Sequence, residues 1–599
     1  MQTQYKPPIN LLSQLKQYRS STALEDYLGN PTNPDHIFSF KNSVQLDEQE
    51  VYPEDITNLL EKWGFYYYYI PSAYGGKLES YEEILSLMRV ISRRDLTVAI
   101  GHGKTYLGSV GVWVGDDEIK KYKLARIIKE GKQVALGLTE KDHGSDINAN
   151  EVLAEEVEDG YLLTGEKWLI NNATRSKAMT IFAKTDQQAG PRNFSVFLIE
   201  KEGLDPTSYQ HLKKIKTHGI RGADISGIRF NQCLIPKASM VGKPGMGLES
   251  TLKGFQITRT LCASLSLGAA DTALRSTLAF ADSRQLYGDR IFSIPVVQQQ
   301  LVDAFVDIMI CECVAISAAR AIHVVPEQMS VWSAVVKYFV PTMAENLIQD
   351  LSRILGARYY LRESHWDGIF QKMVRDNAIV SLFDGSTSVN LYAIALSQKH
   401  FGKYRKRIEA NQSNKLNDIL EDIFSLTQDL PDASLEKLSL FNQGYNSTIQ
   451  SLEISLIKLE KIYHSQEANS EVIEIIIYYA SKIRDLIEKL YERFNSVTQL
   501  KPYKESPDIF TYAKHYCMLH AATTCLNMWL YNRNDISIFF EKGEWLVLCL
   551  QRLMILLLNS EDLLKNEEIL NSCKTNLSDE LITLYNQNNL FSIIPTQLG

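Results

Sequence analysis

Residues 138–146 read Leu-Thr-Glu-Lys-Asp-His-Gly-Ser-Asp. They close a run that contains the small residues Ala135 and Gly137. A hairpin-like stretch follows at residues 165–172, which read Gly-Glu-Lys-Trp-Leu-Ile-Asn-Asn. A polar loop that leads into a hairpin is an ordinary feature by itself. The loop becomes informative because two further stretches follow it at long distances along the chain.

These two distant stretches complete a pattern of four pieces. Residues 284–288 read Arg-Gln-Leu-Tyr-Gly, and residues 382–387 read Leu-Phe-Asp-Gly-Ser-Thr. In this order the four pieces resemble the acyl-CoA dehydrogenase family of flavoproteins, over about residues 50–400. Each piece alone would be a weak motif, whereas the four together are typical of the family. The resemblance implies an FAD-dependent oxidoreductase that acts on the CH–CH group of an acyl thioester.

The composition is that of an ordinary globular protein. Of the 599 residues, 45% are hydrophobic and 22% are charged, with a formal net charge of −8. This acidic balance argues against a nucleic-acid partner, which favours a basic surface. The first residues show no apolar signal segment. The longest apolar run, residues 545–558, contains Gln551 and Arg552 and is shorter than the roughly 20 residues that span a bilayer. We therefore expect a cytoplasmic protein without a transmembrane segment.

Neither the cysteines nor the histidines predict a metal site. The chain has eight cysteines, and the only close pair, Cys311 and Cys313, has one residue between its members. That spacing suits neither a zinc ligand pair nor a redox CxxC site. We expect eight buried or free thiols and no metal. Residues 101–105, Gly-His-Gly-Lys-Thr, resemble the end of a phosphate-binding loop, but Val98 stands where the first glycine belongs.

The hydrophobic periodicity changes twice along the chain. Apolar residues recur at helical spacing, then alternate in short strand-like runs near residues 161–164, 179–183, 194–199 and 225–230, and then return to helical spacing. The pattern predicts a mainly α protein with a small central β-domain. The resemblance implies an N-terminal helical domain, a β-barrel-like domain and a C-terminal four-helix bundle, followed here by an additional all-α domain. The expected divisions are a leader at 1–50, a helical domain at 51–132, a β-domain at 133–247, a helical bundle at 248–405 and a helical extension at 410–599.

Asp384 is the candidate catalytic base. The resemblance implies that this carboxylate removes the α-proton of the thioester. Such a weak acid requires a desolvated base, and the apolar neighbours Val380, Leu382 and Phe383 can exclude water. The family uses glutamate here, so aspartate draws the carboxylate back by roughly 1.5 Å, one carbon–carbon bond. The alternative is an N-cap aspartate that opens the following helix. Thr258 stands where another branch of the family carries its base, and it cannot take that role.

The resemblance also assigns residues to the cofactor and to the substrate. Leu138 and Thr139 would lie along the isoalloxazine, Leu169 and Asn171 would cover its other face, Arg284 would pair with the pyrophosphate across a subunit interface, and Tyr287 would pack near the adenine. The full cofactor set is Leu136, Leu138, Thr139, Gly144, Ser145, Leu169, Asn171, Arg284, Tyr287, Ser386 and Ser388. The substrate set is Arg259, Ser145 and Gly385. Two departures weaken the adenine end: Pro295 replaces a usual glutamine, and residues 356–360 replace a glycine-rich loop.

Several alternatives remain open at this point. The acyl carrier could be coenzyme A or the phosphopantetheine of an acyl carrier protein in fatty acid or polyketide metabolism. The electron acceptor could be an electron-transfer partner or O2, as in an acyl-CoA oxidase. An α-carbanion that closes a ring would need the same base. A degenerate, non-catalytic scaffold would also fit the departures. The resemblance implies a homodimer or a homotetramer.

Overall fold

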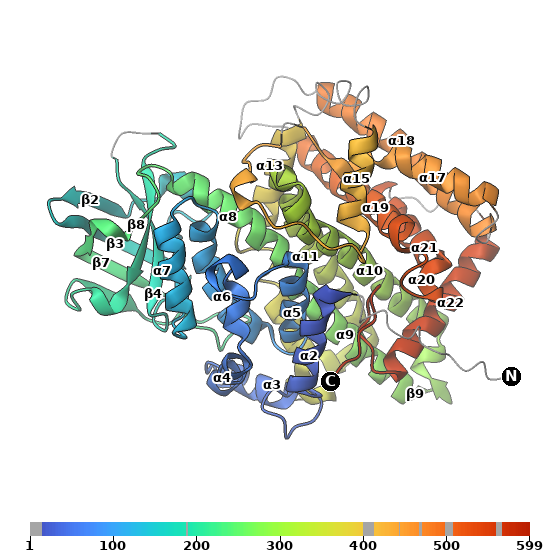
Figure 1. Ribbon diagram of the computed structural model, residues 1–599. Coiled ribbons are helices and arrows are strands. Elements are labelled where there is room, and N and C mark those ends of the chain that lie inside the picture. Colours follow the sequence, from blue (N-terminus) through green and yellow to red (C-terminus); the bar gives the residue numbers. More distant parts are fainter. Residues whose placement is uncertain are drawn as a thin grey trace.

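The structure is a computed structural model in which helices flank one sheet (Figure 1). It describes residues 15–186, 190–363, 365–398, 413–442, 444–465, 470–496, 507–558 and 566–599. The strands lie at the left of Figure 1, the N-terminal helices and the bundle lie in the middle, and the C-terminal helices lie at the right. The mainly α fold class with a small central sheet is therefore confirmed. The basic junction at residues 403–407 lies outside the described residues.

The N-terminal part consists of helices and begins earlier than expected. Its helices are α2 (Arg19–Leu28), α3 (Phe40–Glu48), α4 (Glu54–Trp63), α5 (Tyr81–Ser92), α6 (Leu96–Trp113) and α7 (Glu118–Lys129). The expectation of a poorly defined leader at 1–50 is thus wrong for its described residues. The carboxylate of Glu25, on α2, accepts hydrogen bonds from Arg93 and Arg94, which follow α5. A buried ion pair therefore fastens this first helix to the body.

The central sheet has eight strands in the order β6-β7-β3-β2-β4-β5-β8, with β1 parallel to β4. The end strands β6 and β8 do not pair with each other among the described residues. The β-domain is therefore an open sheet, whereas the family resemblance implied a barrel-like one. Its strands are β1 (Val134–Gly137), β2 (Leu153–Val157), β3 (Gly160–Asn171), β4 (Ala178–Lys184), β5 (Phe194–Glu200), β6 (Tyr209–Leu212), β7 (Ile225–Pro236) and β8 (Met240–Val241).

A helical bundle follows the sheet. Its helices are α8 (Gly247–Leu261), α9 (Ala263–Ser283), α10 (Pro295–Val324), α11 (Met329–Leu355), α12 (Ile369–Asn377) and α13 (Thr387–Gln398). Helix α11 lies at the centre and packs against α8, α9, α10 and α13. The long periodic segments predicted these helices, apart from α12, which is short. Core side chains are nearly continuous along α10 and α11, because both helices are surrounded by others.

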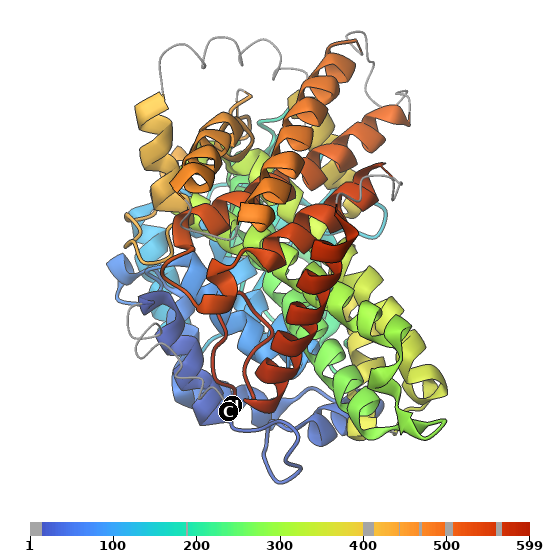
Figure 2. The ribbon, with the colours of Figure 1, turned by 90° about the vertical axis from the view of Figure 1, so that its right-hand side faces the viewer.

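The C-terminal extension packs directly on this bundle. Its main helices are α15 (Ser413–Phe424), α17 (Leu452–Ser465), α18 (Ser470–Ser496), α19 (Asp508–Asn532), α21 (Glu544–Leu558) and α22 (Glu567–Asn586). Helices α15, α19, α21 and α22 all contact α10, and Figure 2 shows them across the face turned to the viewer. The last residues return to the body, where the N–H of Ile593 donates to Glu312 at 2.7 Å and the N–H of Phe591 donates to Asp271 at 3.0 Å.

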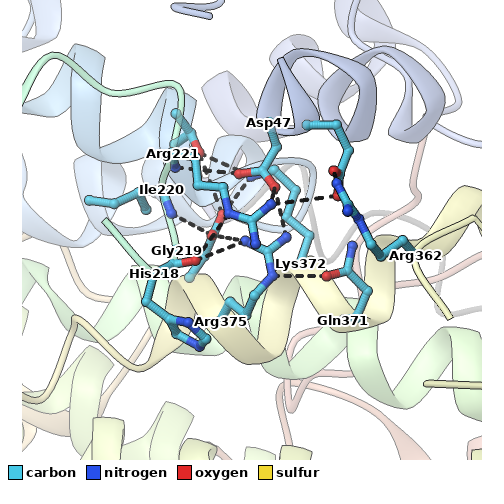
Figure 3. A network of polar contacts seen from close by, with 12 residues as sticks. Asp47, His218, Gly219, Ile220, Arg221, Arg362, Gln371, Lys372 and Arg375 are labelled. Carbon is cyan, nitrogen blue, oxygen red and sulfur yellow. Dashed lines mark hydrogen bonds and ion pairs between the residues drawn. The ribbon is translucent and has the colours of Figure 1, made fainter. Parts of the chain in front are cut away.

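A buried polar network holds α12 against the N-terminal helices and the loop before β7 (Figure 3). The Arg375 guanidinium contacts Asp47 on α3 at 2.7 Å. The N–H of Ile220 donates to Asp376 at 2.6 Å, and the Lys372 ammonium also donates to Asp376. Burial alone would lower the pKa of Lys372, but neighbouring carboxylates, chiefly that of Asp376, raise this pKa. The network therefore fixes the segment that leads into the turn at 384–385.

Three expectations concern the chain as a whole. All eight cysteines are buried free thiols, as predicted. No group of three or more potential metal ligands occurs within the described ranges. In the same part of the chain, no helix is both long enough and apolar enough to cross a bilayer.

Candidate active site

Asp384 lies in a tight turn between α12 and α13. Its φ is +53° and that of Gly385 is +97°. A Cβ at Gly385 would come within 2.7 Å of Arg259 Nη2, so only glycine fits there. Arg259 Nε donates to the carbonyl of Asp384 at 2.9 Å and holds the turn. A left-handed conformation at a non-glycine residue costs on the order of 1–3 kcal/mol and is enriched at functional sites.

The carboxylate of Asp384 is shielded from water. Its side chain is 11% exposed, and Oδ1 lies 3.6 Å from Lys104 Nζ on α6. Oδ2 lies 3.9 Å from the Cys262 thiol, which donates to it. Burial raises the pKa of Cys262 to about 11, so this thiol stays protonated at neutral pH. The carboxylate thus faces the side chains of α6 and the junction of α8 with α9, an arrangement that does not favour the N-cap alternative.

A partly open pocket adjoins this carboxylate. Its volume is about 60 Å³, enough for a few water-sized groups. The wall is mostly apolar and includes Ile84, Met88, Leu107 and Leu265, whereas Asp384 lies at one edge. Such a space suits a short acyl chain, and its apolar lining limits the hydration of the adjoining carboxylate.

Two lysines flank the ring of Phe383, the residue before the candidate base. Lys104 Nζ lies 4.3 Å from the ring centroid and Lys337 Nζ lies 4.5 Å from it. Lys337 also donates to the carbonyl of Val380. Burial lowers the pKa of Lys337, and it lowers the pKa of Arg259 as well. Cation–π contacts and a carbonyl therefore replace much of the hydration that these cations lose.

A buried ion pair shapes the loop at 138–146. Lys167 on β3 is fully buried, and its Nζ donates to Glu140 at 2.7 Å and to the carbonyl of Leu138 at 3.0 Å. Burial lowers the pKa of Lys167 to about 8. In addition, the N–H of Trp168 donates to the carbonyl of Thr139 at 2.9 Å. These bonds bring Leu138 and Thr139 beside β3, as the cofactor assignment requires.

The end of β3 carries two unusual side chains. The pairing of β3 with β7 is irregular between Trp168 and Ile170. Leu169, at this irregularity, has a φ of +56° and is 41% exposed. Asn171 is buried, and neither its amide oxygen nor its amide nitrogen has a partner among the described atoms. Because buried polar groups are normally hydrogen-bonded, this amide suits the polar edge of a bound flavin, and the exposed Leu169 suits its apolar face.

Helix α6 connects the end of β3 with the cavity. The side-chain amide of Asn172 donates to the carbonyl of Gly101 at 2.7 Å. One turn further along the helix, Lys104 borders the cavity. Gly108 allows α6 to touch β1, since a Cβ there would lie 2.5 Å from the carbonyl oxygen of Val134. The cofactor candidates of β1 and β3 and the cavity therefore share one wall.

Other predicted residues lie at the surface. Gly144 and Ser145 are exposed, and a Cβ at Gly144 would meet nothing within 4 Å. Leu136 and Ser386 are partly buried, whereas Ser388 is exposed. Close backbone approach does not require glycine at 144 within the described chain. The cofactor roles of these residues stay predictions.

Arg284 and Tyr287 lie away from the other candidates. They belong to a hairpin formed by β9 (Gln285–Leu286) and β10 (Asp289–Arg290), where Tyr287 is 96% exposed. Figure 1 shows β9 at the opposite end of the molecule from the sheet. One chain therefore does not bring Arg284 and Tyr287 to the cofactor residues of β1 and β3. Pro295 departs from the family because it opens α10 at the first turn, where proline is favoured.

Sequence reasoning missed the four charged side chains that shape the site. Lys104 lies in the Gly-His-Gly-Lys-Thr stretch. This stretch resembles only the end of a phosphate-binding loop, and it forms part of α6. Lys337 lies in a long apolar helix, where a lone lysine suggests a solvated face. Glu140 and Lys167 were within the quoted motifs, but nothing in their spacing indicates that they pair. A signal was available for Lys337 alone, as one charge inside a run that is otherwise nearly all apolar.

Comparison with known proteins identifies the class to which this fold and site belong. Residues 135–233 match the family model of the acyl-CoA dehydrogenase middle domain, and residues 245–398 match that of the acyl-CoA dehydrogenase C-terminal domain. The chain therefore contains segments that match two domains of the acyl-CoA dehydrogenase family, and the predicted resemblance to this family is confirmed. The predictions of an oxidoreductase acting on CH–CH groups and of FAD agree with these matches.

Individual proteins show how far the similarity extends. The probable acyl-CoA dehydrogenase FadE25 of Mycobacterium tuberculosis is 26% identical over 349 residues, which are 58% of this chain and 88% of that protein. The solved FAD complex of PigA has a TM-score of 0.56 at 21% identity, covering 66% of this chain and 98% of that one. The prolyl acyl carrier protein oxidase AnaB has a TM-score of 0.57 at 19% identity, covering 64% of this chain and 98% of that one.

Proposed function

We propose that this protein is an FAD-dependent enzyme that desaturates an acyl thioester between Cα and Cβ, with Asp384 as the base. One observation carries the proposal. Asp384 combines a left-handed turn, a shielded carboxylate and a position in the lining of a mostly apolar, partly open pocket. A strained, desolvated carboxylate is expected where a weak carbon acid loses its proton.

The residues of the chain divide the work as follows. The Asp384 carboxylate removes the proton from Cα, and Arg259 holds its turn through the backbone carbonyl. Leu138, Thr139, Leu169 and Asn171 would hold the flavin. When bound, FAD supplies the acceptor for the hydride that leaves Cβ, so that a double bond forms between the two carbons. The apolar lining of the cavity limits the access of water to the carboxylate.

A catalytic role fits the site better than a scaffold role. The amide of Asn171 and the hydroxyl of Thr258 are both buried without a partner among the described atoms. Leaving such groups unsatisfied costs about 1–3 kcal/mol each. A scaffold gains nothing from this cost, whereas a ligand that completes these bonds recovers it. The two orphaned groups therefore support a site that binds ligands.

The carrier of the acyl group is the finer part of the proposal. The departures at Asp384 and at residues 356–360 favour a specialised pathway enzyme, and delivery by a carrier protein fits that setting. The fold likeness to the prolyl acyl carrier protein oxidase AnaB is in line with this preference. Coenzyme A remains the alternative carrier, and O2 remains the alternative electron acceptor.

We further propose that the working enzyme contains two copies of the chain. The family resemblance assigns Arg284 and Tyr287 to the cofactor pyrophosphate and adenine, yet both lie on an exposed hairpin far from β3. A second copy that presents its own hairpin would supply the missing contacts. The almost complete exposure of Tyr287 supports this role, because a solvated tyrosine leaves its apolar ring uncovered.

The test is flavin reduction by acyl thioesters without oxygen. Asp384→Asn should bind FAD normally but slow flavin reduction about 1,000-fold, within the range typical for loss of a general base. The matched control is Asp159→Asn, since Asp159 is an exposed aspartate in the turn between β2 and β3, and it should reduce at the parent rate. Equal rates for Asp384→Asn and the parent would refute the assignment. Readmitting air then shows whether O2 reoxidises the flavin rapidly, as in an oxidase.

A further inference from the structure

The cavity beside Asp384 holds more positive than negative charge. Lys104 borders it, and Arg259 and Lys337 are close enough to Asp384 for their charges to interact with its carboxylate. Asp384 is the only carboxylate among the described residues that line the cavity. Glu345 offsets part of the Lys337 charge, because the two groups attract each other. With Asp384 also counted, three cations face two carboxylates, so one positive charge remains for Lys104 and Arg259 to share.

Lys104 has the weakest set of partners among these cations. Arg259 donates to a carbonyl at 2.9 Å, and Lys337 also donates to a carbonyl. The contacts of Lys104 among the described residues are an ion pair at 3.6 Å, longer than a hydrogen bond, and the ring of Phe383. A largely buried ammonium normally takes three acceptors. Lys104 is thus able to donate to a ligand in the cavity.

A neutral donor lies in the same cavity. The hydroxyl of Thr258 is buried without a partner among the described atoms, and Thr258 is one of the lining residues. A hydroxyl and an ammonium that line the same cavity form a pair of donors suited to an anionic oxygen. An unsubstituted hydrocarbon chain would leave both groups without a hydrogen-bond partner, which would cost binding free energy.

We infer that the acyl group of the substrate carries a carboxylate that Lys104 binds, with the Thr258 hydroxyl as a second donor. This inference rests on the proposed function and narrows its substrate class to short acyl thioesters with an acid group near the reacting carbons. The small cavity, about 60 Å³, is in keeping with a short chain.

The same contact explains how Asp384 works beside a cation. An ammonium at 3.6 Å forms an ion pair with the carboxylate and competes with substrate for it. A substrate carboxylate that draws Lys104 to itself breaks this ion pair when the substrate is bound. The carboxylate of Asp384 is then released from Lys104 only when the correct acyl group is present. Lys104 is in this sense a specificity-determining residue.

The experiment compares thioesters of equal chain length with and without the acid. The butyryl thioester of phosphopantetheine is paired with the succinyl one, and the valeryl thioester with the glutaryl one, because coenzyme A and carrier proteins share this arm. Binding to the FAD-loaded protein is measured by calorimetry, and flavin reduction is followed separately under anaerobic conditions. The parent should bind the acid-bearing member of a pair about tenfold more tightly, in line with one hydrogen bond to a charged group.

Variants show whether Lys104 causes that preference. Lys104→Met should abolish or reverse it, whereas Lys104→Arg should keep most of it. Thr258→Val should weaken binding of the acid-bearing thioester about threefold, without a change of charge and with little effect on its neutral partner. Lys121→Met, which removes a lysine paired with the exposed Glu118 on α7, should leave the preference unchanged.

The outcomes separate this inference from the proposed function. If neutral thioesters bind and reduce the flavin as well as their acid-bearing partners, or if Lys104→Met keeps the preference, the inference is overturned and the dehydrogenase proposal stands. If acid-bearing thioesters bind through Lys104 but none reduces the flavin, the inference stands and the dehydrogenase proposal fails. Binding of neither member of either pair overturns both.

Discussion

The Asp384 cavity and the Arg284 hairpin contrast sharply in how complete each is within one chain. At the cavity, Asp384 is shielded, its turn is held by Arg259, and its approach is fixed by α12. At the hairpin, residues 283–290 are all exposed. Under the proposed function, one chain would build the acyl half of the site and leave the adenine half to a second copy. The difference indicates that the cavity depends on contacts within the chain, whereas the hairpin has few of them.

The largest expected effect comes from breaking the network that fixes α12. Lys372 Nζ lies 2.6 Å from Asp95 and also bonds Asp376, and all three side chains are buried. Lys372→Met would leave two carboxylates facing each other without a cation. We expect the free energy of unfolding to fall by about 3–5 kcal/mol, measured by denaturant titration. Flavin reduction by thioesters should also slow, because α12 leads into the turn of Asp384.

A cation of the hairpin provides the matched control. Arg290 pairs with Asp282 at 2.6 Å, but both side chains are largely solvent-exposed. Arg290→Ala should change the stability by less than about 1 kcal/mol, because water already hydrates this pair. If Arg290→Ala and Lys372→Met lowered the free energy of unfolding by similar amounts, the contrast between the hairpin and the α12 network would be refuted.

The sequence predicted the framework well because hydrophobic periodicity is a local property. Strands β3, β4, β5 and β7 and the long helices were found in this way. The open sheet and the helices α2 and α3 were missed, because closure and docking depend on contacts that are distant in sequence. For the candidate site, four short motifs pointed to Asp384 and Asn171, because their order along the chain resembles that of the family, and both roles stay predictions. Lys104 and Lys167 were missed, because their charges acquire meaning only beside partners on other elements.

A second prediction concerns the stability of the protein at acidic pH, which depends on a histidine of α6, the helix that borders the cavity. His102 on α6 bonds the hydroxyl of Tyr69 at 2.6 Å, and burial lowers the pKa of His102 to about 4. In the unfolded chain that pKa is about 6.5, so the unfolded state binds the extra proton between the two values. Stability is therefore lost as the pH falls from 6.5 towards 4. From pH 7 to pH 5 the contribution of His102 should fall by about 2 kcal/mol.

The measurement is a difference between two proteins. Other buried groups also titrate in this window: His323 and His520 act in the same direction as His102, whereas Asp307 acts in the opposite direction, because burial raises its pKa to about 6. His102→Gln should therefore lose about 2 kcal/mol less than the parent between pH 7 and pH 5 in denaturant titrations. Parallel curves for the two proteins would mean that His102 is charged, or hydrated, in the native state.

The smallest effect is expected at the hairpin, and it bears most directly on the comparison. Arg284 is exposed, so Arg284→Ala should leave the unfolding free energy of the FAD-free protein unchanged. If a second copy uses Arg284 to bind the pyrophosphate, the affinity for FAD should fall about tenfold, equivalent to one charge-assisted hydrogen bond. Equilibrium titration with FAD measures this loss, and Arg290→Ala in the same hairpin should retain the parent affinity.

Mixing two defective proteins tests whether Arg284 acts on the other copy. A pair formed by Arg284→Ala and Asp384→Asn contains one site with an intact Asp384 that faces the intact Arg284 of its neighbour. At an FAD concentration that leaves Arg284→Ala largely unloaded, mixing should restore part of the parent rate, because this one site is complete. If Arg284 served its own chain, no copy in the mixture would hold both residues, and no rate would return. Absence of recovery in a sample that forms mixed pairs would assign the hairpin to a role outside the cofactor site.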